Sequence, residues 1–364
     1  MLSGKADYIV LRPVLWHETP VNVAYGIYSG VDLSGGINHL VTGAVEVKVA
    51  AVLVTYNRKE LLVEALTALR AQTRPADTVI VVDNACTDGT ADLVRERFAE
   101  VELLQRTRNL GGAGGFAAGI ARALEGGADL VWLMDDDTVP EPGALRALLA
   151  ARDQAPGGRP VLLASRVLWT DGRAHPMNTP RAKPFATGAE QRAAAAAGCV
   201  PIRSASFVSI LVDAALTRQR GLPQADYFLW NDDFEFTTRL LRGQAGWLCP
   251  ASVVVHKTTT FGSTDADPGA RFFYEVRNKI WTLRARGALS PAERVLYGGA
   301  TLRRWARTFR GSADRGTLRS CLVKGVAAGL RSGPRPTAEV LAAAGAELPG
   351  AVSPKTAPLP RSTA

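Results

Sequence analysis

The stretch Leu130-Val131-Trp132-Leu133-Met134-Asp135-Asp136-Asp137 joins an apolar run directly to three consecutive carboxylates. A short apolar run that ends in polar residues is typical of a buried strand in a parallel sheet. Open α/β sheets bind their ligands beyond the carboxyl ends of such strands. Three adjacent carboxylates repel one another unless a cation lies among them, and Mg²⁺ and Mn²⁺ prefer oxygen ligands. The stretch therefore predicts a cation site at a sheet edge, although a solvated turn or a helix cap also fits the triplet alone.

Strand and helix patterns alternate in the segments before this stretch. Strands are predicted over residues 47–54, 78–82 and 101–105, and helices over residues 60–72, 87–98 and 116–124. Such alternation is typical of a parallel sheet with right-handed crossovers. We therefore expect an α/β fold with a mostly parallel central sheet flanked by helices.

The composition limits the class of protein without deciding it. The chain has 364 residues, of which 47% are hydrophobic, and a formal net charge of +9. This length is sufficient for a sizeable core in one large domain or two smaller ones. The positive charge suits a nucleic acid, a nucleotide-diphosphate substrate or an anionic membrane surface, and charge alone does not choose among them.

The cysteines and the hydropathy bear on the location of the protein. The four cysteines lie far apart, without a CxxC pair, which disfavours a zinc knuckle and is typical of a reduced cytosolic protein. Neither an apolar span long enough for a membrane helix nor a signal peptide is recognised. We therefore expect a cytoplasmic protein.

The pattern changes along the chain divide it into four parts. These are an N-terminal extension of unknown role (1–46), a catalytic domain (47–285), a basic amphipathic helical region (286–332) and a disordered Pro/Ala/Thr-rich tail (333–364). In the third part, Trp305 and Phe309 stand among arginines on a predicted helix over residues 291–310. Such a helix suits contact with the inner face of a membrane, or packing on the catalytic domain, and the sequence leaves both open.

Polar residues follow the first two predicted strands. Thr55, Tyr56 and Arg58 come after the first strand, and Asp83 ends the second, so adjacent strands would turn them toward one crevice. Asp83 can accept hydrogen bonds from a base or a ribose, or it can form an Asx turn. Arg58 can contact a phosphate, although a solvated arginine is common.

A glycine-rich segment follows the third strand. Gly111, Gly112, Gly114 and Gly115 allow the backbone to approach a ligand and lead into a helix whose N–H groups favour anions. The segment lacks the Gly-Lys-Ser/Thr of a phosphate-binding loop and the position of a dinucleotide fingerprint. Asn109 can hydrogen-bond a nucleotide or shape the turn.

A second acidic cluster and a histidine lie further along the chain. Asp232 or Asp233 can act as a general base on an acceptor hydroxyl, or can cap the helix that follows. Trp230 can stack on a sugar or lie in the core. His256 ends an apolar strand and can complete a metal site with Asp135 and Asp137, although a lone histidine is often structural.

The order of these motifs resembles the family 2 glycosyltransferases, which have a GT-A fold. The resemblance covers about residues 47–281. It rests on Thr55-Tyr56-Asn57-Arg58, Asp83-Asn84, Arg108 to Phe116, Asp135-Asp136-Asp137, Asp232-Asp233-x-Glu235 and His256. The glycine-rich stretch, with Asp267 to Phe273 and Arg277-Asn278, is similar to the actinobacterial galactofuranosyltransferase and rhamnosyltransferase branch.

The resemblance implies a role for each matching residue. Thr55, Tyr56 and Asp83 would hold the nucleoside, and Asp136 would face the ribose. Asp135, Asp137 and His256 would bind Mn²⁺ or Mg²⁺. Asp233 would be the general base, with Asp232 as its rival because Asn231 separates Trp230 from the acid pair.

The implied function is metal-dependent inverting transfer of a sugar, with galactofuranose or rhamnose favoured. The donor would carry UDP or dTDP, and the acceptor would be a hydroxyl of a glycan or of a polyprenyl-diphosphate-linked sugar. The alternatives are a non-catalytic GT-A-like glycan-binding protein and a sugar nucleotidyltransferase. A nucleic-acid partner is not expected, because the basic C-terminal residues form no recognisable binding motif.

Overall fold

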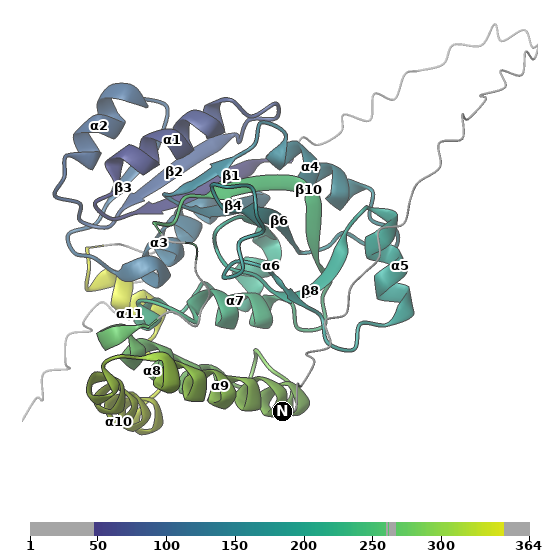
Figure 1. Ribbon diagram of the computed structural model, residues 1–364. Helices are drawn as coiled ribbons and strands as arrows, with labels where there is room; N and C mark the ends of the chain where they lie inside the picture. The colour runs from purple at the N-terminus through teal and green to yellow at the C-terminus, as the bar shows by residue number, and fades with distance from the viewer. Residues whose placement is uncertain (1–46, 260, 262–266, 346–364) are drawn as a thin grey trace, which may run out of the picture. The chain divides into compact units, whose positions relative to one another are not determined.

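A ten-stranded sheet forms the centre of the computed structural model (Figure 1), which describes residues 47–259, 261 and 267–345. The strands are β1 (Val49–Thr55), β2 (Thr78–Asp83), β3 (Glu102–Gln105), β4 (Leu130–Asp135), β5 (Thr138–Pro140), β6 (Leu162–Leu168), β7 (Arg181–Ala182), β8 (Val200–Ser204), β9 (Ile210–Asp213) and β10 (Gly246–His256). The helices are α1 (Lys59–Arg70), α2 (Thr90–Arg97), α3 (Gly111–Glu125), α4 (Ala144–Asp153), α5 (Gly188–Ala196), α6 (Ala214–Arg220), α7 (Asp232–Leu240), α8 (Phe272–Arg284), α9 (Pro291–Gly311), α10 (Arg315–Arg331) and α11 (Thr337–Ala342). The predicted extension over residues 1–46 lies outside the described residues.

The strand order places the carboxyl ends of β1 and β4, where ligands are expected to bind, next to each other. The order is β3-β2-β1-β4-β9-β6-β10-β8-β7, with β5 paired to β10. Strands β3, β2, β1 and β4 are parallel, and β9 joins β4 to β6 in antiparallel fashion. Since β2 lies on one side of β1 and β4 on the other, the carboxyl ends of β1 and β4 flank a topological switch point. The predicted α/β fold with a central sheet flanked by helices is confirmed.

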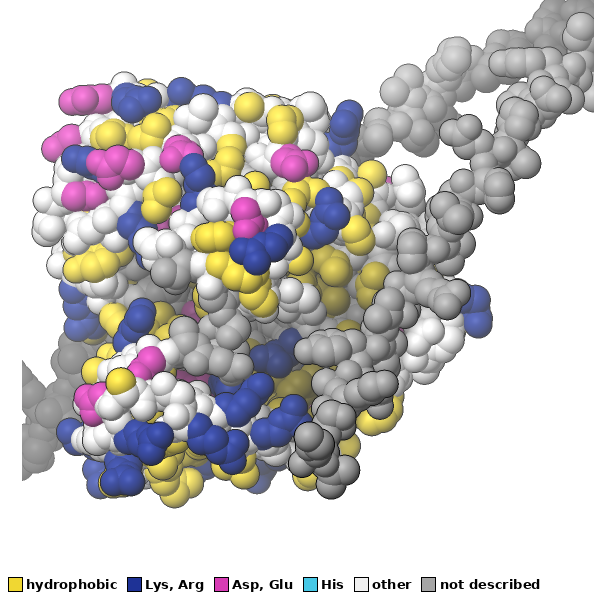
Figure 2. All heavy atoms as spheres, viewed as in Figure 1, with side chains coloured by type: hydrophobic (Ala, Val, Ile, Leu, Met, Phe, Trp, Pro, Cys, Tyr) yellow, Lys and Arg dark blue, Asp and Glu magenta, His cyan; other side chains and the backbone are white. Residues whose placement is uncertain are grey.

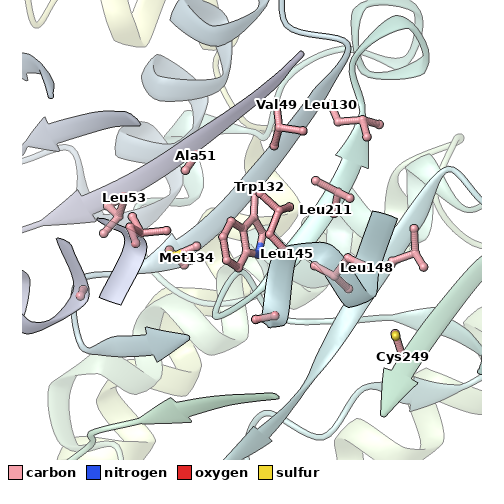
Figure 3. Close-up of a cluster of buried hydrophobic side chains, with 14 of the residues drawn as sticks. Val49, Ala51, Leu53, Leu130, Trp132, Met134, Leu145, Leu148, Leu211 and Cys249 are labelled. Atoms are coloured by element: carbon pink, nitrogen blue, oxygen red, sulfur yellow. The ribbon is translucent and has the colours of Figure 1, made fainter. Parts of the chain in front are cut away.

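Alternate residues of the central strands pack on opposite faces of the sheet. On one face Trp132, between Val49 and Leu148, belongs to a core built with α1 and α4 (Figure 3). On the other face Val52 packs with Phe116 of α3 and Phe236 of α7. Strand β1 is therefore buried on both faces, as its continuous apolar pattern predicted.

Helix α3 begins at Gly111, five residues before the predicted start, so the glycine-rich segment is its first turn. A Cβ on Gly115 would lie 2.4 Å from Val54 Cγ1, and one on Gly111, whose φ is +66°, would lie 2.0 Å from the Phe228 carbonyl oxygen. The glycines therefore serve close packing of the helix end against β1 and the loop before α7. The predicted helix start at residue 116 was wrong. Glycine has a low helix propensity, which hides a helix whose first turn needs glycine for close packing.

The C-terminal helices form a layer next to α7 (Figure 1). Helix α10 packs closely on α8, since a Cβ on Gly325 would lie 2.8 Å from Val276 Cβ. The aromatic side of α9 also faces inward: Trp305 and Phe309 meet the Phe272 ring edge-on, with centroids 5.9 and 5.8 Å away. This packing agrees with the second alternative for this helix, in which it packs on the catalytic domain. None of the helices within the described ranges is both long and apolar enough to cross a membrane.

The prediction of a disordered tail from residue 333 was wrong for residues 333–345. Helix α11 lies there, with Val340 and Leu341 buried against Leu110 and Ala117. The Thr337 hydroxyl donates to the Pro223 carbonyl oxygen (2.8 Å). Composition suggested disorder, but a few apolar residues at helical spacing are enough to dock a short helix on an existing core. Residues 346–364 lie outside the described part.

Candidate active site

The two outer aspartates of the triplet and the distant histidine meet at the sheet edge. Asp135 ends β4 and Asp137 lies in the turn to β5. Strand β5 pairs with β10 so that Thr138 faces His256. The His256 Nε2 atom lies 2.8 Å from Asp137 Oδ1 and 3.9 Å from Asp135 Oδ2. One candidate ligand atom from each of the three side chains falls within 4.8 Å of the others. The predicted juxtaposition is confirmed.

Asn178 sets the orientation of the histidine ring. The Nδ1 atom of His256 lies 2.9 Å from the Asn178 amide oxygen, which can only accept a hydrogen bond. The Asn178 amide nitrogen donates to the Ser206 hydroxyl (3.2 Å), which fixes the direction of the amide. Nδ1 therefore carries a proton, and Nε2 is the ring atom that faces the two aspartates. Sequence reasoning missed Asn178, because no pattern connects a loop residue to a histidine 78 residues away.

The three residues fit a divalent cation. Asp137 Oδ1 is buried and accepts no well-aligned hydrogen bond from the described residues, although the His256 ring is next to it. Partial burial raises the pKa of Asp135 to about 7, with the Asp137 charge adding to the effect, although 38% of the Asp135 side chain is exposed. Burial also acts on Asp137, but the neighbouring His256 ring, when protonated, outweighs it and lowers the pKa of Asp137. Two carboxylates and an imidazole nitrogen form a ligand set that suits Mn²⁺ or Mg²⁺.

Asp232 and Asp233 lie in the first turn of α7, and Asn231 rather than either acid occupies the N-cap position. Burial raises the pKa of Asp232 well above its usual range, and the Asp233 charge raises it further. Burial also raises the pKa of Asp233, against the Phe234 N–H and the charges of Lys279 and Arg181. Neither acid therefore caps the helix, contrary to one of the two alternatives.

A pocket of about 690 Å³ joins the two acidic groups. The predicted residues that line it are Arg58, Gly112, Asp135, Asp137, Trp230, Asp232, Asp233 and His256. A Cβ on Gly112 would lie 4.0 Å from Asp232 Oδ2, so α3 and α7 meet at the pocket wall. The predicted metal ligands and the predicted base therefore share one cavity.

Comparisons with known proteins identify the family. A model of the family described as Glycosyl transferase family 2 matches residues 50–191. The galactofuranosyltransferase GlfT1 of Mycobacterium tuberculosis is 33% identical in an alignment 266 positions long, which covers 66% of this chain and 83% of GlfT1. The chain belongs to glycosyltransferase family 2. This membership confirms the predicted resemblance and excludes the sugar nucleotidyltransferase alternative.

Two further similarities extend the comparison. The N-acetylglucosaminyl-diphospho-decaprenol L-rhamnosyltransferase of Mycobacterium tuberculosis is 28% identical in an alignment 248 positions long, which covers 60% of this chain and 78% of that protein. The crystal structure of S. aureus TarS matches with a TM-score of 0.55 at 17% identity, over 80% of this chain and 50% of TarS. At that identity the likeness shows the fold alone, and it confirms the predicted GT-A fold.

In this family 2 glycosyltransferase, the residues predicted to hold the nucleoside lie beside the triad of Asp135, Asp137 and His256. Strand register places Thr55 opposite Asp83, and both are buried. Asp83 Oδ1 accepts a hydrogen bond from the Cys86 N–H (2.7 Å), so its carboxylate also shapes a turn. Tyr56 is 48% exposed, and its backbone N–H donates to Asp136 Oδ2 (3.4 Å). The nucleoside contacts of these residues stay a prediction.

Two other predicted nucleotide-binding residues make contacts within the protein. The Arg58 guanidinium lies 2.8 Å from Asp137 and 3.4 Å from Asp136. About half of its side chain is exposed, which leaves it free to turn toward a phosphate. The Asn109 side chain accepts a hydrogen bond from the Gly111 N–H (2.7 Å), and this bond shapes the start of α3.

The loop that leads to the acid pair is strained. Phe228, Trp230 and Asn231 have φ values of +63°, +64° and +65°, a region that non-glycine residues rarely adopt. Each such residue costs of order 1–3 kcal/mol and persists only where its surroundings enforce it. Here the buried Asn278 amide donates to the carbonyl oxygens of Tyr227, Leu229 and Trp230 at 2.8–2.9 Å. Asn278 therefore clamps the loop, and sequence reasoning did not assign it this role.

Asn278→Ala is expected to destabilise the enzyme by about 2–4 kcal/mol, because three buried carbonyls lose a donor. Urea unfolding followed by circular dichroism measures the change. Asn278→Asp keeps the shape but removes the N–H donors, so it should be at least as damaging. An Asn278→Asp variant of wild-type stability would refute the clamp.

Asn178→Ala is expected to weaken Mn²⁺ binding roughly 10- to 100-fold, the usual cost of losing a group that orients a metal-binding histidine. Isothermal titration with Mn²⁺ and UDP provides the measurement. Asn178→Asp still offers an acceptor to His256 Nδ1, so it should retain most of the affinity. Equal loss in both variants would show that Asn178 has only a packing role.

Proposed function

We propose that this family 2 glycosyltransferase is a metal-dependent, inverting enzyme that moves a sugar from a nucleotide-diphosphate donor to an acceptor hydroxyl. The observation that carries the proposal is the shared pocket. Asp135, Asp137 and His256 lie together at one part of it, as a set that suits a cation, and the buried Asp232 and the partly buried Asp233 line another.

The donor is proposed to be a galactofuranosyl or rhamnosyl nucleotide that carries UDP or dTDP. The similarity to GlfT1 supports the first sugar, and the similarity to the rhamnosyltransferase supports the second. TarS, which shares the fold, has been crystallised in complex with UDP. Thr55 and Asp83 are the proposed partners of the nucleoside because they stand at adjacent strand ends beside the triad.

Transfer is proposed to occur by direct displacement. Asp233 takes the proton of the acceptor hydroxyl while the oxygen attacks the anomeric carbon, and the bond to the donor diphosphate breaks. A raised pKa makes the Asp233 carboxylate a better base than an exposed one, which suits this role. A divalent ion on Asp135, Asp137 and His256 would neutralise charge on the leaving diphosphate. No covalent intermediate is needed.

The acceptor is proposed to be a glycan or a sugar on a polyprenyl diphosphate. The name of the similar rhamnosyltransferase specifies a decaprenol-linked diphosphate, which supports a lipid-linked acceptor. Helix α9 is the proposed contact with the inner face of the membrane. Val295 and Leu302, two turns apart, are 78% and 65% exposed, whereas Phe309, two turns further along the same side, packs on Phe272. Co-sedimentation with anionic vesicles, lost in a Val295→Ser, Leu302→Ser double variant, would test this contact.

Thermal unfolding with UDP, dTDP and GDP, each with Mn²⁺ or with EDTA, tests the function. A ligand that binds only the native state raises the melting temperature. Either UDP or dTDP should raise the melting temperature of the enzyme by several degrees in Mn²⁺ and have little effect in EDTA. Stabilisation that is the same in EDTA, or that is absent with all three nucleotides, would contradict the proposal.

A further inference from the structure

One wall of the pocket is cationic. Arg181 of β7, Lys279 of α8 and Arg304 of α9 all line it. The Lys279 Nζ atom lies 4.4 Å from the centroid of the Phe234 ring, and the Arg181 guanidinium lies 5.5 Å from the same ring. Both cations therefore stand next to the helix turn that carries Asp233. Figure 2 shows Lys and Arg side chains gathered beside the hollow, over the layer of C-terminal helices.

Lys279 is the most unusual member of this wall. Its side chain is 5% exposed, and its ammonium makes no hydrogen bond or ion pair with any residue in the described ranges. Burial lowers its pKa to about 8, and Arg304 and Arg181 lower it further, against Glu275 and Asp233. A buried ammonium that meets an aromatic ring but no hydrogen-bond acceptor among the described residues is costly, and this group therefore suits an anionic ligand.

The nearest carboxylate is already engaged. Glu275 accepts hydrogen bonds from the Asn231 amide (2.8 Å) and the Trp305 indole (3.1 Å) and forms an ion pair with Arg304. Neither Arg181 nor Lys279 has a hydrogen-bonded carboxylate among the described residues, so both of these cations that line the cavity are available to an anionic ligand.

The wall lies on other elements (β7, α8 and α9) than the metal-type residues, which lie at the ends of β4 and β10. The cations that act on Asp233 are Lys279 and Arg181. The positive groups that act on Asp135 are His256 and Arg58. The pocket therefore offers two places for anionic groups, and the triad suits the donor diphosphate.

We propose that the cationic wall binds a phosphate or diphosphate group carried by the acceptor, beside Asp233. The inference rests on the proposed function, because it takes Asp233 as the base that meets the acceptor hydroxyl. Guanidinium and ammonium groups in a partly dry pocket recognise phosphate oxygens strongly. Trp305, which is partly exposed, lines the same pocket and offers apolar surface to a prenyl chain next to the phosphate.

Titration with farnesyl diphosphate in EDTA tests the wall without the metal site. The wild type should bind it, and Lys279→Gln and Arg304→Gln should each raise Kd roughly tenfold through loss of a charged donor. Arg303→Gln removes the neighbouring cation on α9, which does not line the pocket, and should leave Kd unchanged. Unchanged binding in both pocket variants, or equal loss in Arg303→Gln, would overturn the proposal.

Two comparisons complete the experiment. Farnesyl diphosphate should bind more tightly than inorganic pyrophosphate and farnesol, and equal binding of pyrophosphate would overturn the assignment to a lipid-linked acceptor. Arg181→Gln changes an exposed residue, so it provides a folded variant if Lys279→Gln does not fold, and it too should raise Kd. The pocket variants should keep their stabilisation by UDP or dTDP with Mn²⁺. If UDP and dTDP with Mn²⁺ fail to stabilise the wild type, the proposed function is contradicted, whether or not farnesyl diphosphate binds.

Discussion

Asp233→Asn is expected to fold and to bind the donor nucleotide with Mn²⁺, but to lose sugar transfer by about 10²–10⁴-fold. The amide has nearly the shape of the carboxylate but cannot accept the hydroxyl proton. Asp233 lies next to Lys279 and Arg181, at the part of the pocket that we assign to the acceptor. Single-turnover transfer from radiolabelled donor measures the loss.

Asp232→Asn is the matched control for the base. The Asp232 carboxylate lies near Gly112 of α3, and the Asp135 charge acts on it, so it stands nearer the donor side. Its substitution should weaken donor binding more than the proton transfer. Wild-type turnover in Asp233→Asn together with loss of turnover in Asp232→Asn would move the base by one residue.

Asp137→Asn is expected to weaken Mn²⁺ binding by more than about 100-fold, the largest loss usual for a group that only orients a ligand. Asp137 is buried, lies 2.8 Å from His256 Nε2 and has an oxygen without a well-aligned hydrogen bond from the described residues. Isothermal titration with Mn²⁺ and nucleotide measures the affinity. Nucleotide binding that needs Mn²⁺ in the wild type should become undetectable in the variant.

Asp92→Asn is a suitable control for this experiment, because that carboxylate is 80% exposed and does not line the pocket. It should leave both affinities unchanged. Mn²⁺ affinity that survives in Asp137→Asn would remove the triad from the proposed metal site. The effect on melting temperature should be measured in parallel, since Asp137 also pairs with Arg58.

Much of the donor side could be predicted from the sequence, because it depends on strand ends. An apolar run that stops at Asp135 places the carboxylates at the sheet edge, and the same logic places Asp83 beside Thr55. His256 could be predicted for the same reason, since it ends β10. Parallel strands bring their carboxyl ends together whatever their separation in the chain.

The supporting contacts could not be predicted, because they join residues without a common pattern. Asn178 meets His256 across 78 residues, and Asn278 meets Trp230 across 48. Positive φ values at Phe228 and Trp230 cannot be expected of such residues, since bulky side chains rarely adopt them. The charge of Lys279 becomes informative only once its burial is known. Tertiary packing decides these features, as it decides the helix at residues 337–342.

The pocket takes its two parts from different lengths of chain. Asp135 and Asp137 lie within residues 50–191, which match the family model, as does Arg181, whereas Lys279 and Arg304 belong to α8 and α9, outside that match. On the proposed assignment, α8 and α9 can then change the acceptor while Asp135 and Asp137 are kept. A chimaera that receives residues 267–345 from another branch should keep its sugar nucleotide and adopt the lipid carrier of the helix donor.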